Sequence, residues 1–162
     1  MNIENVAVIE RAELEFDSGF NVLTGETGAG KSIIIDALGA VLGERTTRDI
    51  VRAGESNANI SALFEQISPS TVSQLEALGI FVDENDSLFL HRTISSDGKG
   101  SCYVGTKPVT VGILREIGRL LVNTHGQHEN QNLLNPDKHV EYLDRLGNHL
   151  QIRETYQARY HE

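Results

Sequence analysis

The sequence predicts an α/β fold built around one glycine-rich loop between a strand and a helix. The loop, GETGAGKS, occupies residues 25–32. A compact apolar run, FNVLT at 20–24, precedes the loop and predicts a strand. Apolar residues on most sides of the segment from Lys31 to Leu42 predict a buried helix, and Gly43 is a natural end for it. This order of strand, loop and helix is what predicts the fold class.

Two further strands are predicted before the loop. The segments 3–9 and 11–16 are short and rich in apolar residues, and the second alternates Ala12, Leu14 and Phe16 with charged residues. Because such alternation is typical of a strand with one face in water, we expect these segments to form an antiparallel edge.

Another strand, a short helix and a hairpin are predicted after the first helix. Apolar and polar residues alternate over 58–67, and Ser68 then favours a helix to about Leu78, because a serine oxygen accepts hydrogen bonds from the first free amides. The segments 87–94 and 101–109 flank the sequence SSDGKG. They predict a β-hairpin, since Asp-Gly and Gly supply the positive φ that a tight turn needs.

The C-terminal part is predicted to be mostly helical. Helical spacing over 110–120 predicts one helix, and LLVNT at 120–124 favours a short buried strand after it. A last helix is predicted from Pro136, and Gly147 weakens its middle. The final residues are compatible with a helix and carry no cap, so we expect the chain to stop inside a longer helix.

Composition excludes several classes of protein. The 162 residues suit one domain, and 14 basic against 23 acidic residues give a net charge of −9, which disfavours a strongly basic nucleic-acid reader. No apolar run approaches the ~20 residues of a membrane span, and the acidic start does not fit a signal peptide. Cys102 is alone and is expected to be a small buried hydrophobic residue. These features favour a cytoplasmic protein without membrane contact.

The glycine-rich loop fits the pattern G-x-x-x-x-G-K-[ST], which predicts a phosphate-binding P-loop. Its glycines let successive backbone amides face an anion, and the positive end of the following helix adds to the attraction. Lys31 is expected to reach the β and γ phosphates and to act in catalysis, and the Ser32 hydroxyl is expected to bind Mg²⁺. The residues expected to contact the nucleotide are Gly25, Glu26, Thr27, Gly28, Ala29, Gly30, Lys31, Ser32 and Ile33.

A second acidic site for Mg²⁺, normally an apolar strand that ends in Asp, does not follow the P-loop. The run Ile33 to Asp36 resembles such a strand, but it falls within the predicted helix, so Asp36 is expected to be structural. The guanine-reading motif Asn-Lys-x-Asp is absent as well, which disfavours a GTPase. The sequence after the P-loop therefore shows no recognisable second acidic ligand for Mg²⁺.

Five stretches of the chain form a recognisable set: IENVAVIE at 3–10, GETGAGKSIIIDAL at 25–38, RTISSDGKGSCYV at 92–104, LREIGRLL at 114–121 and HGQHENQNLL at 125–134. Together they resemble the RecN family of bacterial DNA repair ATPases, which belongs to the structural-maintenance-of-chromosomes (SMC) class of ABC-type ATPases. The resemblance runs through essentially the whole chain, and the HGQH stretch is more specific than the P-loop.

The resemblance implies the N-terminal lobe of a split ATPase head, with a mixed and antiparallel sheet and the start of a coiled-coil arm. Residues 1–135 would form the ATP-binding lobe, and residues 136–162 the root of the arm. In this family a C-terminal segment supplies the signature motif and the Walker B acid. By the same resemblance Gln127 is the glutamine-loop residue, with a catalytic role at Mg²⁺ or the attacking water. His125 is the alternative for that position.

The resemblance further implies ATP and Mg²⁺ as cofactors and a role in double-strand-break repair and recombination. Its partners would be the C-terminal head segment, a second ATP-bound head, and DNA in the full-length, nucleoid-associated protein, with weak or no DNA contact for this acidic piece. Hydrolysis is expected only in the completed, dimerised head. Two alternatives stay open: a self-contained P-loop kinase or phosphotransferase, and a coiled-coil assembly module that nucleotide merely stabilises.

Three smaller features also leave alternatives open. His125 and His128 could bind a metal, but two ligands without a third are a poor metal signature. Arg45, Arg48 and Arg52 follow the P-loop helix and form either a solvated basic face or a contact for nucleotide or DNA backbone. Because a half-head must leave the docking surface of its partner bare, we also expect exposed apolar surface near the P-loop helix.

Overall fold

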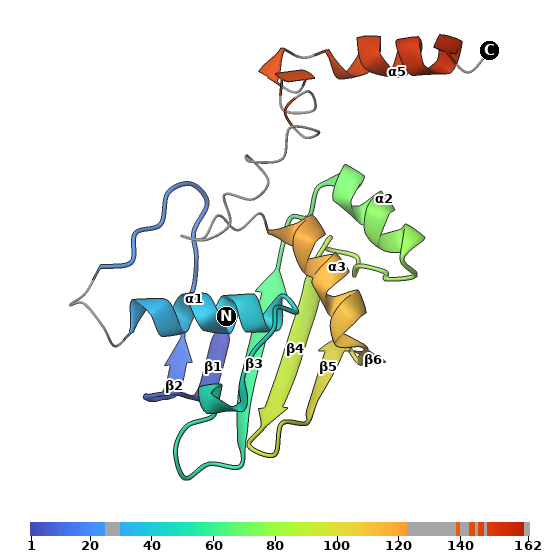
Figure 1. The fold of residues 1–162 in the computed structure, drawn as a ribbon. Helices are drawn as coiled ribbons and strands as arrows, with labels where there is room; N and C mark the ends of the chain where they lie inside the picture. The colour runs from blue at the N-terminus through green and yellow to red at the C-terminus, as the bar shows by residue number, and fades with distance from the viewer. Residues whose placement is uncertain (25–29, 123–138, 140–142, 145, 148, 161–162) are drawn as a thin grey trace. The chain divides into compact units, whose positions relative to one another are not determined.

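The computed structural model describes residues 1–24, 30–122, 139, 143–144, 146–147 and 149–160. The chain divides into two compact units, Met1–Asn123 and Thr124–Glu162, each of which has its own internal contacts. The first unit contains a sheet with helices, and the second contains a helix near the C-terminus (Figure 1).

The first unit is organised by a six-stranded sheet with the order β2-β1-β3-β4-β5-β6. Every pairing in it is antiparallel. The strands confirm the predicted N-terminal pair, the strand after the P-loop helix and the hairpin. Their bounds are β1 (Asn2–Val6), β2 (Ile9–Glu13), β3 (Asn57–Phe64), β4 (Leu88–Ser95), β5 (Gly100–Val104) and β6 (Lys107–Val109).

Helices cover one face of this sheet. α1 (Lys31–Val41) contacts β1, β3 and β4, while α3 (Val111–Leu121) contacts β5 and α2 (Pro69–Ala77) (Figure 1). A single 3₁₀ turn, η1 (Arg48–Ile50), lies between α1 and β3.

The core lies between these helices and the sheet. Every second residue of β3 and β4 points into it, as the period of a strand requires, and the remaining residues form an open, mostly polar face that also carries Leu63 and Phe89. The largest fully buried side chains are Ile3, Ile60, Leu75, Leu90, Leu114, Ile117, Val6 and Val41.

Local sequence signals set the helix ends. The side-chain oxygen of Ser68 accepts a hydrogen bond from the amide of Thr71 at 3.2 Å, and that of Thr110 accepts one from Ile113 at 3.3 Å. Each therefore satisfies one free amide in the first turn of its helix. Gly43, with φ +86°, follows the last turn of α1 as predicted, since glycine tolerates this left-handed conformation.

Several boundaries differ from the predictions. The chain turns at residues 7–8, inside the first predicted strand (3–9), so β2 begins at Ile9 rather than at residue 11 and ends at Glu13 rather than at residue 16. The second arm of the hairpin is two strands rather than one, because Gly105 (φ +57°) turns the chain between β5 and β6. The strand predicted at 120–124 is wrong where it can be checked: Leu120 and Leu121 belong to α3, whose helical hydrogen bonding runs on to the amide of Val122. Apolar residues that continue a helical pattern stay in the helix unless a breaker intervenes.

The second unit contains α5 (Leu150–Tyr160) after a turn at Gly147. A turn at this position agrees with the prediction that Gly147 weakens the middle of the C-terminal helix, whereas Pro136 lies outside the described residues. The rings of Tyr156 and Tyr160 stack with centroids 6.1 Å apart, as side chains four positions apart on one helix face can. In the part of the chain that the structure describes, no helix has both the length and the apolar character to span a lipid bilayer.

Candidate nucleotide-binding site

The described part of the P-loop is the start of α1. Gly30 takes the N-cap position, and its carbonyl accepts the first helical hydrogen bond, from Ile34 at 3.1 Å. No side chain among the described residues caps this end, so the helix presents amides and the positive end of its dipole there. Lys31 is half-buried and Ser32 is exposed in the first turn. Both stand where a P-loop needs its ammonium and its hydroxyl.

Several predicted site residues lie outside the described residues. These are Gly25, Glu26, Thr27, Gly28, Ala29, Gln127 and its alternative His125. His128, the other half of the possible metal pair, lies outside them too, and the described residues contain no group of three or more His, Cys, Asp or Glu side chains that could hold a metal ion. Gly30, Lys31, Ser32 and half-buried Ile33 are the predicted contacts whose position is given.

α1 is buried at one end only. Its C-terminal residues Ala37, Ala40 and Val41 are fully buried, whereas Ile35 near the N-terminus keeps 56% of its surface exposed. The prediction of a helix buried throughout is therefore right for its second half and wrong for its first. Asp36 is exposed on this helix and not at the end of a strand, as predicted. The N-terminal end of α1, which carries the described part of the P-loop, is thus less buried than its C-terminal end.

The strand predicted at 20–24 is absent from the structure. This segment has no regular secondary structure, and Phe20 is 94% and Val22 63% exposed. A strand needs a neighbour to accept and donate its backbone hydrogen bonds, and none of the described strands pairs with this segment. Together with Ile35, these side chains confirm the expected exposed apolar surface near the P-loop helix.

A hollow of about 370 Å³ runs along the open side of α1. Ile33, Asp36 and Ala40, spaced three and four residues apart, form one wall, and residues 44–47 form part of the other. Arg45 lines this hollow, and Asp36, Glu44 and Asp49 also line it. The arrangement is mixed in charge rather than basic.

The other two arginines of this region have separate surroundings. Arg48 is exposed, and Arg52 donates a hydrogen bond to the carbonyl of Val8 at 2.7 Å. The amide of Arg52 donates to the carbonyl of Asn5 at 2.9 Å, so this residue fastens the turn between β1 and β2. Arg52 therefore has a structural role, and the three side chains do not form one basic patch.

Arg92 on β4 is the residue near the site that sequence reasoning missed. Its side chain is 7% exposed and lies on the buried face of the sheet, in phase with Leu90 and Ile94. Nη1 donates to the carbonyls of Ala40 at 2.6 Å and Glu44 at 2.8 Å. The signal that could have found it is a charged residue at an inward position of an alternating strand.

The charge of Arg92 is balanced by peptide carbonyls. Burial lowers the pKa of the Arg92 guanidinium from its ordinary value; the nearby Cys102 thiol acts in the opposite direction, and the positive charge of Arg115 lowers it further. Cys102 is buried, which confirms the prediction of a small buried residue, and this burial raises the pKa of its thiol. The carbonyl ends at the C-terminus of α1 carry partial negative charge, which suits a buried cation.

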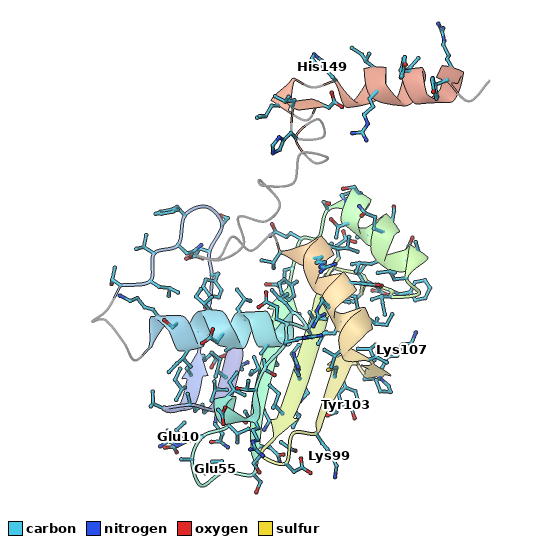
Figure 2. The ribbon with its side chains drawn as sticks, viewed as in Figure 1. Glu10, Glu55, Lys99, Tyr103, Lys107 and His149 are labelled. Carbon is cyan, nitrogen blue, oxygen red and sulfur yellow. The ribbon has the colours of Figure 1, made fainter. Side chains whose placement is uncertain are left out.

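Other charged side chains stand apart from this region. Figure 2 shows Glu55 in the loop before β3 and Lys99 in the turn between β4 and β5, both at the lower end of the sheet in that view. A second hollow, of about 290 Å³, lies on the open polar face and is lined by residues of β1 to β4, among them Glu4, Ser61 and His91.

A family model described as an AAA domain matches residues 1–157. The chain belongs to this AAA domain family. Proteins named DNA repair protein RecN are similar to it: that of Halalkalibacterium halodurans is 49% identical over 149 residues, and that of Bacillus subtilis 45% over 148. The matches cover 91% of this chain but 26% of each relative, so the chain spans about a quarter of their length.

Solved structures give the same fold for this AAA domain. A chain from work on ATP-driven dimerization and DNA-stimulated activation of SMC ATPases superposes with a TM-score of 0.64 at 18% identity, covering 90% of this chain and 96% of that one. The Smc head domain of Pyrococcus furiosus, with an extended coiled coil and bound to the C-terminal domain of ScpA, gives 0.63 at 20% identity, over 83% and 37%. The fold is that of the N-terminal lobe of an ABC/SMC-type P-loop NTPase head.

Proposed function

We propose that this chain is the ATP-binding N-terminal part of a RecN-like DNA repair ATPase. The observation that carries the proposal is the P-loop at the exposed start of α1, in a chain similar to the N-terminal quarter of RecN proteins. The fold supports it, because SMC heads use the same lobe. Double-strand-break repair and recombination would then be the activity of the longer protein, in the bacterial cytoplasm at the nucleoid.

Each P-loop residue has a role that its chemistry supports. The backbone amides of residues 25–30 would bind the phosphates, and the Lys31 ammonium would hold the β and γ oxygens. The Ser32 hydroxyl would bind Mg²⁺, whose charge offsets that of the triphosphate. Ile33 would pack beside the loop, and Gln127 would contact Mg²⁺ or orient the attacking water through its amide.

The site needs a second segment to hydrolyse ATP. The exposed apolar residues at 20–24 and at the start of α1 suit docking of a C-terminal head segment, which would bring the Walker B acid and the signature motif. Two ATP-bound heads would then pair, and residues 136–162 would start the arm that connects the two segments, after the ATP-binding lobe at 1–135. With a net charge of −9, this piece would leave most DNA contact to the rest of the protein.

The two alternatives are less well supported. A self-contained phosphotransferase needs an acidic metal ligand beside Ser32, and the similarity to RecN proteins does not favour that class. A nucleotide-stabilised assembly module would need no water-activating group and would not turn over ATP. ATP turnover that appears when the C-terminal segment is added would therefore favour the ATPase over the assembly module.

Titration with Mg-ATP tests the proposed binding site. Lys31→Ala should weaken nucleotide affinity by at least about a hundredfold, because a charge-assisted contact to phosphate is lost. Lys99→Ala is the matched control, since Lys99 is 88% exposed at the hairpin turn and is expected to leave affinity unchanged. Equal affinity of the wild type and Lys31→Ala would reject the P-loop as the binding site.

A further inference from the structure

We propose that Arg92 is a positioning residue for nucleotide binding. It does not contact the nucleotide itself; it orients α1, whose N-terminal residues do. The inference rests on the proposed function, because it needs nucleotide at the N-terminal end of that helix. It adds a residue from the middle of the sheet, outside the P-loop and away in the sequence from Gln127 of the predicted glutamine loop.

Arg92 joins β4 to two consecutive segments of the chain. Nη1 donates to the Ala40 carbonyl within α1 and to the Glu44 carbonyl just after it, and Nη2 donates to the Thr46 hydroxyl at 3.3 Å. The planar guanidinium holds these acceptors in fixed directions, which a single ammonium cannot do. One buried side chain therefore fixes both the end of α1 and the turn that leaves it.

The effect of this contact on the far end of α1 follows from where the helix is buried. The helix has 11 residues and is fully buried only towards its C-terminus. At 1.5 Å per residue it is about 16 Å long, so a tilt of about 5° at the fixed end moves the other end by about 1.4 Å. Lys31 and Ser32 lie at that other end. A displacement of about 1 Å can greatly weaken an interaction that depends on exact positioning. The way in which the C-terminal end of α1 is held therefore affects phosphate affinity at its N-terminal end.

The same hydrogen bonds shape the hollow beside α1. Ala40, Glu44 and Thr46, the three residues that Arg92 contacts, all line it. Without the guanidinium, residues 44–47 would lose their hydrogen bonds to β4. Ile33 and Asp36, which form the opposite wall, would still be held on α1. Arg92 thus sets the distance between the two walls as well as the direction of the helix.

A second contact keeps the fold intact when Arg92 is changed. Arg115 on α3 donates through Nε to the Gly43 carbonyl at 3.0 Å, and Leu42 is buried against the core. The end of α1 therefore remains attached to α3 in a variant that lacks the Arg92 guanidinium. We expect such a variant to fold, with a less well-fixed helix.

The test compares Mg-ATP affinity in the chain joined to its C-terminal head segment, at a temperature where circular dichroism shows every variant folded. Arg92→Met should raise the Kd about tenfold, and Arg92→Lys should recover part of that loss, because an ammonium can still donate to the same carbonyls. Arg11→Met is the control, since the Arg11 side chain is 77% exposed on β2, and it should leave the Kd unchanged. A role in stability alone would lower the melting temperature and leave the Kd of the folded protein unchanged.

The outcomes separate this inference from the proposed function. Wild-type affinity in folded Arg92→Met, together with lost affinity in Lys31→Ala, would overturn the role of Arg92 and leave the P-loop site standing. No dependence on Lys31 would overturn both. If Arg92→Met does not fold, Thr46→Val removes a single acceptor and should raise the Kd two- to threefold, about half a kcal/mol. An unchanged Kd for that variant would overturn the inference.

Discussion

Arg115 on α3 donates a hydrogen bond through Nε to the carbonyl of Gly43, 72 positions earlier, across a distance of 3.0 Å. A Cβ on Gly43 would run into the backbone of Leu114 and Arg115. The close approach of the two backbones and the left-handed φ of +86° both require glycine at this position. The junction between α1 and α3 therefore depends on Gly43.

Gly43→Ala should destabilise the protein by about 2–5 kcal/mol, because a left-handed alanine and an overpacked contact add together. Gly54→Ala is the matched control: its φ is +92°, but a Cβ there meets nothing within 4 Å. That change should cost about 1–2 kcal/mol. Urea unfolding measures both values, and equal losses would contradict the tight junction.

Leu90→Ala should destabilise the sheet by about 2–5 kcal/mol, since Leu90 is fully buried at the centre of β4. Leu63→Ala on the neighbouring strand removes the same atoms from a side chain that is 53% exposed. It should cost less than about 1 kcal/mol. Chemical denaturation of the two variants compares them directly, and a reversed order would mean that the faces of the sheet are wrongly assigned.

Asp83 should titrate below its ordinary pKa of 3.8. Ser87 lowers this pKa most, through hydrogen bonds from its hydroxyl and its amide, and the Asn85 amide adds to the effect. Because the pKa of the Asp83 carboxyl is lower in the folded than in the unfolded protein, ionised Asp83 stabilises the fold at pH above its unfolded-state pKa. This stabilisation is lost as the pH falls through its folded-state pKa. Ser87→Ala should move the pKa upward in a carboxyl NMR titration, whereas Ser73→Ala should not.

Cys102 should react slowly with thiol reagents in the folded protein. It is 4% exposed, and burial raises the pKa of its thiol, so little of the reactive thiolate forms at neutral pH. In urea the reaction should be fast. Labelling at equal rates in both conditions would show that the thiol is accessible and that β5 does not pack as described.

Features with strong local signals could be predicted from the sequence. The helix from Lys31, the cap at Ser68 and the hairpin each depend on residues within a few positions of one another. The segment 20–24 could not, because an apolar run becomes a strand only beside a partner strand, and none of the described strands adjoins it. The role of Arg92 also escaped prediction, since its acceptors are 46 to 52 positions away in the sequence.

The candidate site also has features that the sequence predicts and features that it does not. The P-loop pattern gave Gly30, Lys31 and Ser32 a place at the start of a helix, and the structure puts them there. The pattern could not predict how burial changes along α1, because that depends on contacts with β1, β3 and β4, which are distant from the loop in the sequence.

ATP turnover tests the central claim most directly, with the 162-residue chain measured alone and then joined to its C-terminal head segment. We expect little or no hydrolysis by the chain alone, clear hydrolysis after joining, and loss of that hydrolysis in Lys31→Ala. Strong turnover by the isolated chain would contradict the account, since it would mean that a complete phosphotransfer site already exists within these residues.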